Sequence, residues 1–408
     1  MARQRMVPRG LALAVMAGVL WGWRVAPAGA ASPPCWLPAF TAPMHPSASG
    51  LEPGDFAGPS FKNQTVRMFV RPTLAGPRLR LVLSNQYGTE PLRVEAVRVA
   101  LRASGSAIDP ATDREVRFSG ATFVSIPPGR TATSEPIVLA VDGLRDVAVS
   151  LFFLDRSGAA SWHLHSGRTT FISATGNRTA ARTFEPALTT RSLYFLAAVH
   201  VDTAPDASLV VAFGDSITDG VGSTVDMESS WPARLSRRLA TRGGRPVGVL
   251  NAGLGGNRLL SDGYGPKGLH RFERDVLAQR GVKAVILLEG VNDIGRAVPG
   301  TMAAARIIDG YQQLIQRARD KGLKVFGGTL TPMSGHAYFT PENEALREAV
   351  NAWIRGSGAF DAVIDFEAAV RDPANPDAMP ASLTADGLHP NDLGYERMAQ
   401  AIDLQLLE

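Results

Sequence analysis

The chain has 408 residues, of which 45% are hydrophobic and 20% are charged, so it can bury more than one core and is too apolar to be disordered. Its formal charge is +4, but the first thirty residues hold four arginines and no lysine, aspartate or glutamate. The remaining 38 basic and 38 acidic residues balance. Charge therefore gives no reason to expect a nucleic acid or a polybasic membrane contact.

The first thirty residues have the pattern of a cleavable secretory signal. Arginines precede an apolar run over residues 11–23, and the small residues Ala28, Gly29 and Ala30 follow it. The run is too short to span a bilayer comfortably, although an uncleaved N-terminal anchor remains the alternative. We expect residues 1–30 to be a signal peptide, the protein to be secreted or periplasmic, and the mature chain to lack a transmembrane segment.

The only cysteine, Cys35, lies just after the expected cleavage site. An oxidising compartment has therefore not been used for an internal disulfide. We expect Cys35 to be a free thiol near a flexible end.

Residues 36–204 are predicted to form an all-β accessory domain. Short runs rich in Val, Leu, Phe and Thr alternate with turn residues, and leucines 79, 81 and 83 fall on one face of such a run. The expected strands are 65–70, 78–83, 94–101, 115–118, 122–126, 136–141, 147–154 and 193–201. So many short strands without a helical period favour a β-sandwich or jelly roll.

Residues 206–408 change to strands alternating with helices. Apolar runs at 209–213, 247–250, 282–288, 324–326 and 362–364 suit a parallel sheet that is buried on both faces. Helices are expected at 231–242, 269–278, 303–321 and 342–355, with an amphipathic segment at the end of the chain. In such an α/β unit, ligands bind at the carboxyl ends of the strands.

Four segments at these carboxyl ends carry chemistry. Their sequences are GDSITDG at 214–220, NAGLGGN at 251–257, EGVND at 289–293 and DGLHP at 386–390. Taken alone, the first segment is also a sequence typical of an ordinary turn. The second is a glycine-rich loop that lacks the spacing of the dinucleotide fingerprint and the lysine of the P-loop.

Together the four segments resemble the SGNH hydrolases, also called GDSL-type esterases. The resemblance covers residues 206–408 and implies a flavodoxin-like, three-layer α/β/α catalytic domain. It also implies that Ser216 is the nucleophile, His389 the general base and Asp386 its orienting carboxylate. The N–H groups of Ser216 and Gly256 and the side-chain amide of Asn292 are then expected to form the oxyanion hole.

These residue types suit the chemistry. A serine hydroxyl is a poor nucleophile at neutral pH and needs a base within hydrogen-bond reach, together with donors for the oxyanion. Asp386 and His389 are close enough in sequence to satisfy each other. No Gly-x-Ser-x-Gly elbow occurs in the chain, and neither a metal nor another cofactor is required.

Several other residues have two interpretations. His163 and His165 could bind a metal or a sugar, but a structural pairing is favoured because no third ligand is apparent. His336 could line the substrate cleft, but a solvated loop histidine is favoured. Asp215 and Asp219 are expected to stabilise the serine loop through hydrogen bonds, and Trp231 is expected to be a core residue.

The sequence thus predicts a secreted serine ester hydrolase that works through an acyl-enzyme. An ester substrate is expected, with short acyl groups such as acetyl on a carbohydrate favoured by fold-level analogy. A lipase or lysophospholipase, an acyltransferase and a catalytically silent glycan-binding protein are the alternatives. If residues 36–204 form an independent domain, a fragment starting near Asp206 should fold and hydrolyse small esters; otherwise it should aggregate.

Overall fold

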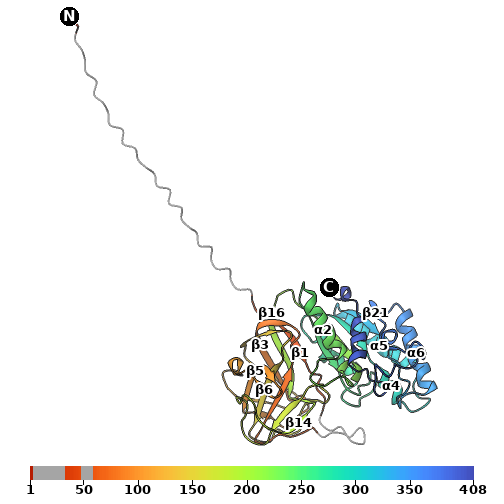
Figure 1. The fold of residues 1–408 in the computed structure, drawn as a ribbon, viewed down its shortest axis with the longest axis horizontal. Helices are drawn as coiled ribbons and strands as arrows, with labels where there is room; N and C mark the ends of the chain where they lie inside the picture. Colours follow the sequence, from red (N-terminus) through yellow and green to blue (C-terminus); the bar gives the residue numbers. More distant parts are fainter. Residues whose placement is uncertain (3–32, 47–57) are drawn as a thin grey trace. The chain divides into compact units, whose positions relative to one another are not determined.

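The computed structural model describes residues 1–2, 33–46 and 58–408. Nearly all of the expected signal peptide lies outside the described residues, so export of the protein stays a prediction. Pro34–Glu408 form one compact unit, in which a β-rich region is followed by an α/β region (Figure 1). This order of a β-rich region and an α/β region confirms the predicted fold class. In the part of the chain described here, no helix combines the length and apolar character that crossing a membrane requires.

The β region holds two main antiparallel sheets. The first has the order β1 (Cys35–Thr41), β16 (Leu196–Thr203), β3 (Ala75–Ser84) and β10 (Ile137–Asp142), with β9 (Thr131–Thr133) beside β3. The second has the order β14 (Pro186–Thr190), β13 (Thr170–Ser173), β2 (Gln64–Val70), β11 (Val147–Phe153), β5 (Ala96–Ser104) and β6 (Ala107–Ile108), with β7 (Arg114–Glu115) beside β5. Two short pairs join β12 (Trp162–His163) to β15 (Leu193–Tyr194) and β4 (Leu92–Val94) to β8 (Val124–Ile126), and the 3-10 turn η1 spans Pro110–Thr112.

Alternation of apolar and polar residues explains the strands. In β3, Leu79, Leu81 and Leu83 are fully buried, as expected for one face of a half-buried strand. The predicted strand over residues 193–201 is interrupted at Phe195, whose φ of 60° ends β15 before β16 begins. Cys35 is a free thiol and is the first residue of β1, where it pairs with Thr203.

The α/β region is built on a five-stranded parallel sheet. Its order is β18 (Val247–Gly253), β17 (Ser208–Gly214), β19 (Val282–Leu288), β20 (Lys324–Gly328) and β21 (Ala362–Ile364). In chain order this is the 2-1-3-4-5 arrangement of flavodoxin-like folds. Every residue of β17 is buried, which matches a strand covered on both faces.

The helices of the α/β region form two packed groups. One group comprises α2 (Trp231–Arg242), α7 (Phe366–Val370) and α8 (Asp392–Gln400); the other comprises α3 (Gly268–Phe272), α4 (Val291–Gly295), α5 (Ala304–Asp320) and α6 (Pro341–Gly356). The single turn α1 (Ser216–Asp219) follows β17, the π-helical turn η2 spans Glu273–Leu277 and the closing 3-10 turn η3 spans Leu404–Leu407. A doubly wound sheet needs two such groups of helices, one for each face.

The two regions share one hydrophobic core. Strand β1 of the β region packs on β18, and the Leu37 side chain is so close to Gly281 that a Cβ there would lie 2.7 Å from it. A Cβ on Gly248 would similarly lie 2.9 Å from Leu74. The independence of the two predicted domains stays a prediction.

Candidate active site

Ser216 lies where the buried strand β17 ends. It is the first residue of α1, and the Asp215 side chain before it accepts a hydrogen bond of 3.0 Å from the N–H of Ile217. This side chain caps the turn that carries the serine, as the sequence predicted for Asp215. Burial raises the pKa of Asp215 to about 7, and the nearby Asp293 acts in the same direction.

His389 links Ser216 to Asp386 through hydrogen bonds. The Nε2 atom of His389 is 2.8 Å from the Ser216 Oγ atom, and its Nδ1 atom is 2.7 Å from Asp386 Oδ2. With the proton on Nδ1, the ring donates to the carboxylate and accepts the hydroxyl proton of the serine. The structure thus brings together three of the predicted site residues in the order that nucleophilic catalysis requires.

The loop that holds Asp386 is rigidly bonded. Asp386 Oδ1 accepts the backbone N–H groups of Leu388 and His389 at 3.0 and 2.8 Å. Burial alone would raise the pKa of Asp386, but the hydrogen bonds from His389 and Leu388 lower it to about 2. The carboxylate is therefore ionised at neutral pH and available to orient the imidazole.

The loop after β18 places Gly256 beside the aromatic ring of Tyr264. Gly256 has a φ of 70°, which favours glycine, and a Cβ at this position would lie 2.6 Å from that ring. Both the backbone conformation and the lack of space therefore require glycine here. Within the described ranges, the structure records no hydrogen-bond acceptor for the backbone N–H of Gly256 or of Ser216. Both donors can therefore serve a ligand.

Asn292 contacts this loop from the carboxyl end of β19. It lies in α4 just after β19, and its Nδ2 donates to the carbonyl oxygen of Asn257 at 2.9 Å. Its Oδ1 accepts the hydroxyl of Tyr338 at 3.0 Å, and Tyr338 in turn accepts from Arg296 Nε at 2.7 Å. These contacts fix which end of the amide is the donor and leave its second N–H available.

One buried guanidinium lies beneath the site. The side chain of Arg271 is 0% exposed and donates to the carbonyls of Gly214 and Ala252 and to Asn257 Oδ1, each at 2.7 Å. It also contacts Asp275 at 3.1 Å. Arg271 thereby ties together the carboxyl ends of β17 and β18 and the loop of Gly256.

The environments of the three other candidate histidines agree with the expectations from the sequence to different degrees. His163 is in a structural pairing with Asp219, at 2.9 Å, as favoured from the sequence. His165 lies beside Gly255, where a Cβ would come within 2.9 Å of its ring. The ring of His336 lies 6.5 Å from that of His389, so it borders the catalytic histidine although the sequence favoured a solvated loop.

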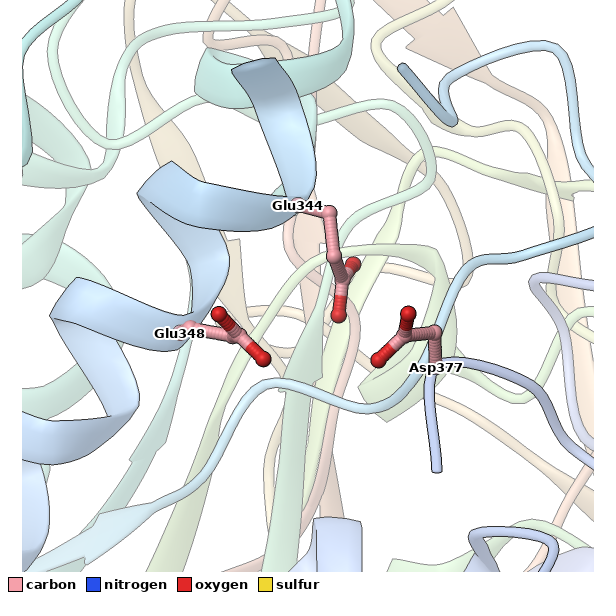
Figure 2. Close-up of side chains that lie close together, drawn as sticks. All are labelled: Glu344, Glu348 and Asp377. Atoms are coloured by element: carbon pink, nitrogen blue, oxygen red, sulfur yellow. The ribbon is translucent and has the colours of Figure 1, made fainter. Parts of the chain in front are cut away.

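A group of carboxylates elsewhere could hold a metal ion. The carboxylates of Glu344 and Glu348 on α6 and of Asp377 turn toward one another, with oxygens within 4.8 Å (Figure 2). Glu344 is buried and already paired with Arg347, whose Nε lies 3.1 and 3.0 Å from its two oxygens. We therefore assign this cluster no part in the chemistry.

Sequence reasoning missed Tyr338 and Arg271, because neither lies in the four segments. Nothing distinguishes Arg271 from other arginines of amphipathic helices until the fold shows that it is buried. The sequence provided a reason to consider His163 and Asp219 separately, but it did not predict that they pair with each other. Trp231 is fully buried, as expected of a core residue.

Comparisons with known proteins support the resemblance. Residues 212–397 match the model of the GDSL-like Lipase/Acylhydrolase family. The GDSL lipase Rv0518 of Mycobacterium tuberculosis is 29% identical over 200 residues, which are 47% of this chain and 79% of that protein.

Solved structures also match about half of the chain. The acetyl xylan esterase AlAXEase is 27% identical, covers 47% of this chain and 96% of its own, and has a TM-score of 0.37. A carbohydrate acetylesterase family member from Sinorhizobium meliloti is 16% identical, covers 49% and 96%, and has a TM-score of 0.39. Residues 212–397 therefore carry a GDSL-like lipase/acylhydrolase domain, and this family indicates a carboxylic ester hydrolase.

Proposed function

We propose that the protein hydrolyses esters through an acyl-enzyme on Ser216, with His389 as general base and Asp386 as its orienting carboxylate. The observation that carries the proposal is the unbroken hydrogen-bond chain from Asp386 Oδ2 through His389 to Ser216 Oγ, at 2.7 and 2.8 Å. A base this close can accept the serine proton without rearrangement.

The reaction then proceeds in two balanced halves. The Ser216 Oγ atom attacks the ester carbonyl carbon while its proton passes to His389 Nε2. The tetrahedral intermediate collapses, the bond to the alcohol oxygen breaks, and His389 returns the proton to that oxygen. Water then repeats the sequence on the acyl-enzyme and releases the carboxylic acid and free serine.

Three donors stabilise the negative charge on the carbonyl oxygen. They are the backbone N–H groups of Ser216 and Gly256 and the second N–H of Asn292, none of which is committed elsewhere among the described residues. Preorganised donors of this kind act on the transition state more than on the ground state.

We propose a short acyl group on a polar alcohol, such as a carbohydrate, as the substrate. The supporting observation is the polar and aromatic character of the side chains around the triad. His336 lies near His389, and Arg296 lies 5.2 Å over the Tyr264 ring beside Gly256. Such groups suit hydroxyl-rich partners better than a long acyl chain.

The test combines labelling with a substrate series. A phosphonylating reagent should modify Ser216 and abolish hydrolysis of 4-nitrophenyl acetate, and Ser216→Ala should reduce turnover by at least about a thousandfold. Turnover should fall from acetate to palmitate esters, acetylated glycans should be substrates, and a chelator should have no effect. Labelling at another residue, or activity lost to chelator and restored by a divalent ion, would contradict the mechanism. A preference for palmitate would instead indicate a lipase.

A further inference from the structure

A chain of hydrogen bonds runs from the β region to the loop of Gly256. His163 lies in β12 and is 4% exposed, and its Nε2 is 2.9 Å from Asp219 Oδ1. The other oxygen of Asp219 accepts the backbone N–H of Gly255 at 3.1 Å. One carboxylate therefore connects a histidine of the β region to the residue next to a proposed oxyanion donor.

The contacts of His163 define its charge. Its second ring nitrogen, Nδ1, lies 3.0 Å from the carbonyl oxygen of Pro43. A carbonyl and a carboxylate oxygen only accept, so both contacts are hydrogen bonds only when each ring nitrogen carries a proton. Burial opposes this charge, but Asp219 and the Pro43 carbonyl outweigh it and raise the pKa of His163.

His45, which is equally buried, provides the contrast. Its Nδ1 donates to the carbonyl of Pro46 at 3.1 Å, and its Nε2 accepts the N–H of Leu164 at 3.1 Å. One donor and one acceptor are the pattern of a neutral ring, and burial lowers the pKa of His45 to about 3. His163 is therefore the cationic histidine of the two.

The position of Asp219 lets this ion pair act on the oxyanion loop. Asp219 ends α1, the turn that begins with Ser216, and its side chain is 4% exposed. Its backbone packs against the last residue of β18, just before the loop, because a Cβ on Gly253 would lie 2.1 Å from the Asp219 nitrogen. The His163–Asp219 contact joins two buried side chains, and removing one partner of such a pair is strongly destabilising. Without His163, the acceptor that holds the Gly255 N–H is lost or displaced.

We propose that His163 is a positioning residue of the hydrolase: as an imidazolium it holds Asp219, and through Asp219 it holds the Gly255–Gly256 backbone where the oxyanion forms. The inference rests on the proposed function, since it concerns the donor assigned there to Gly256. It makes the β region a part of the active site, and not only an accessory that meets the substrate.

The experiment measures kcat and KM on 4-nitrophenyl acetate with the full chain. The variants are His163→Gln and Asp219→Asn, with His200→Gln as the matched control, because His200 is a half-buried histidine of β16 that lies beside Arg80. Competent sites are counted by titration with the phosphonylating reagent, so that kcat refers to folded enzyme only. We expect kcat per site to fall about tenfold to a hundredfold in both variants with KM within about twofold, since a misplacement of about 1 Å can cost a hundredfold.

The double variant tests whether the two residues act as a unit. His163→Gln with Asp219→Asn should be no slower than the slower single variant, because both changes break the same link. An unchanged kcat per site in His163→Gln, or losses that multiply in the double variant, would overturn the inference. If Ser216→Ala is inactive while His163→Gln is unimpaired, the inference alone fails; if Ser216→Ala is active, the proposed function fails.

A measurement on the unaltered protein tests the proposal even if the variants do not fold. Nitrogen-15 NMR of the histidine rings should show both nitrogens of His163 still protonated at a pH where exposed histidines have become neutral, because its pKa is raised. His45 should show one protonated nitrogen at the same pH. Formation of the phosphonyl adduct should shift the His163 N–H signals. A neutral His163 ring with unshifted signals would contradict the proposal.

Discussion

At the scale of single residues, the amide of Asn292 is the donor whose setting the structure defines best. The hydroxyl of Tyr338 fixes its oxygen end, and the Asn257 carbonyl takes one of its two N–H groups. The remaining N–H is the one that we propose binds the oxyanion, and the two contacts keep the amide from flipping. Tyr338 thus holds this proposed donor in one orientation.

We predict that Asn292→Ala lowers kcat on 4-nitrophenyl acetate about a hundredfold to a thousandfold with little change in KM, the usual effect of removing an oxyanion donor. Tyr338→Phe should lower kcat only about threefold to tenfold, because it removes one neutral hydrogen bond that orients the amide. Tyr87→Phe is the control, since its hydroxyl bonds Arg274 and not Asn292. A raised KM with unchanged kcat in Asn292→Ala would make Asn292 a substrate-binding residue instead.

At the scale of secondary-structure elements, the carboxyl ends of β17 and β18 depend on Arg271. Its guanidinium satisfies one carbonyl from each strand and the side chain of Asn257, and it faces the carboxylates of Asp275 and Glu289 at 3.1 and 3.4 Å. Asp275 also pairs with Arg274, at 2.5 and 2.9 Å, but the two strand carbonyls and Glu289 depend on Arg271. Removing the Arg271 cation leaves these buried acceptors without their donor.

We predict that Arg271→Leu destabilises the protein by about 3–5 kcal/mol, the range found when one member of a buried pair is removed. Urea unfolding measures the loss. Arg237→Leu, at an exposed position of α2, should change the free energy of unfolding by no more than about 0.5 kcal/mol. Equal stability of both variants would show that the carbonyls and carboxylates find other partners.

Prediction from the sequence succeeded where the hydrophobic period was long or the turn chemistry was specific. The helix expected at 231–242 agrees with α2, and the strand at 282–288 agrees with β19, because one has a clear apolar face and the other is apolar throughout. Strand β1 was missed because Pro38 and the bulge near it disguise the alternation. The triad side chains were predicted from their segments, but their hydrogen-bonded geometry depends on strand order.

Contacts between distant segments account for what the sequence could not provide. His163 and Asp219 are 56 residues apart, and Asn292 and Tyr338 are 46 apart. No local pattern pairs a histidine of a two-residue strand with an aspartate after another strand. The His163–Asp219 pair follows only from the way in which the β region packs on the α/β region, and the Asn292–Tyr338 pair follows from packing within the α/β region.

At the scale of the whole molecule, the β region both covers apolar surface and supplies part of the site. Leu37 and Leu74 pack on glycines of the α/β region, and the hydroxyl of Tyr87 bonds Arg274 at 2.9 Å. These contacts and the His163–Asp219 pair show that residues of the β region cover part of the apolar and polar surface of the α/β region. The sequence left two outcomes open for a fragment that starts near Asp206: it folds and hydrolyses small esters, or it aggregates. Because of these contacts, we expect the α/β region to depend on the β region.

A fragment of residues 206–408 tests this dependence. We predict that it is mostly insoluble, because removal of Leu37 and Leu74 exposes the apolar face next to β18. Any soluble fraction should have a kcat per titrated site at least about tenfold below that of the full chain, even on 4-nitrophenyl acetate, because the Gly255 backbone has lost its support. Co-expression with residues 34–205 as a separate chain should restore solubility and turnover. A soluble fragment with full turnover on this small ester would show instead that the two halves are independent domains, and that the alternating strands of residues 36–204 serve only larger substrates.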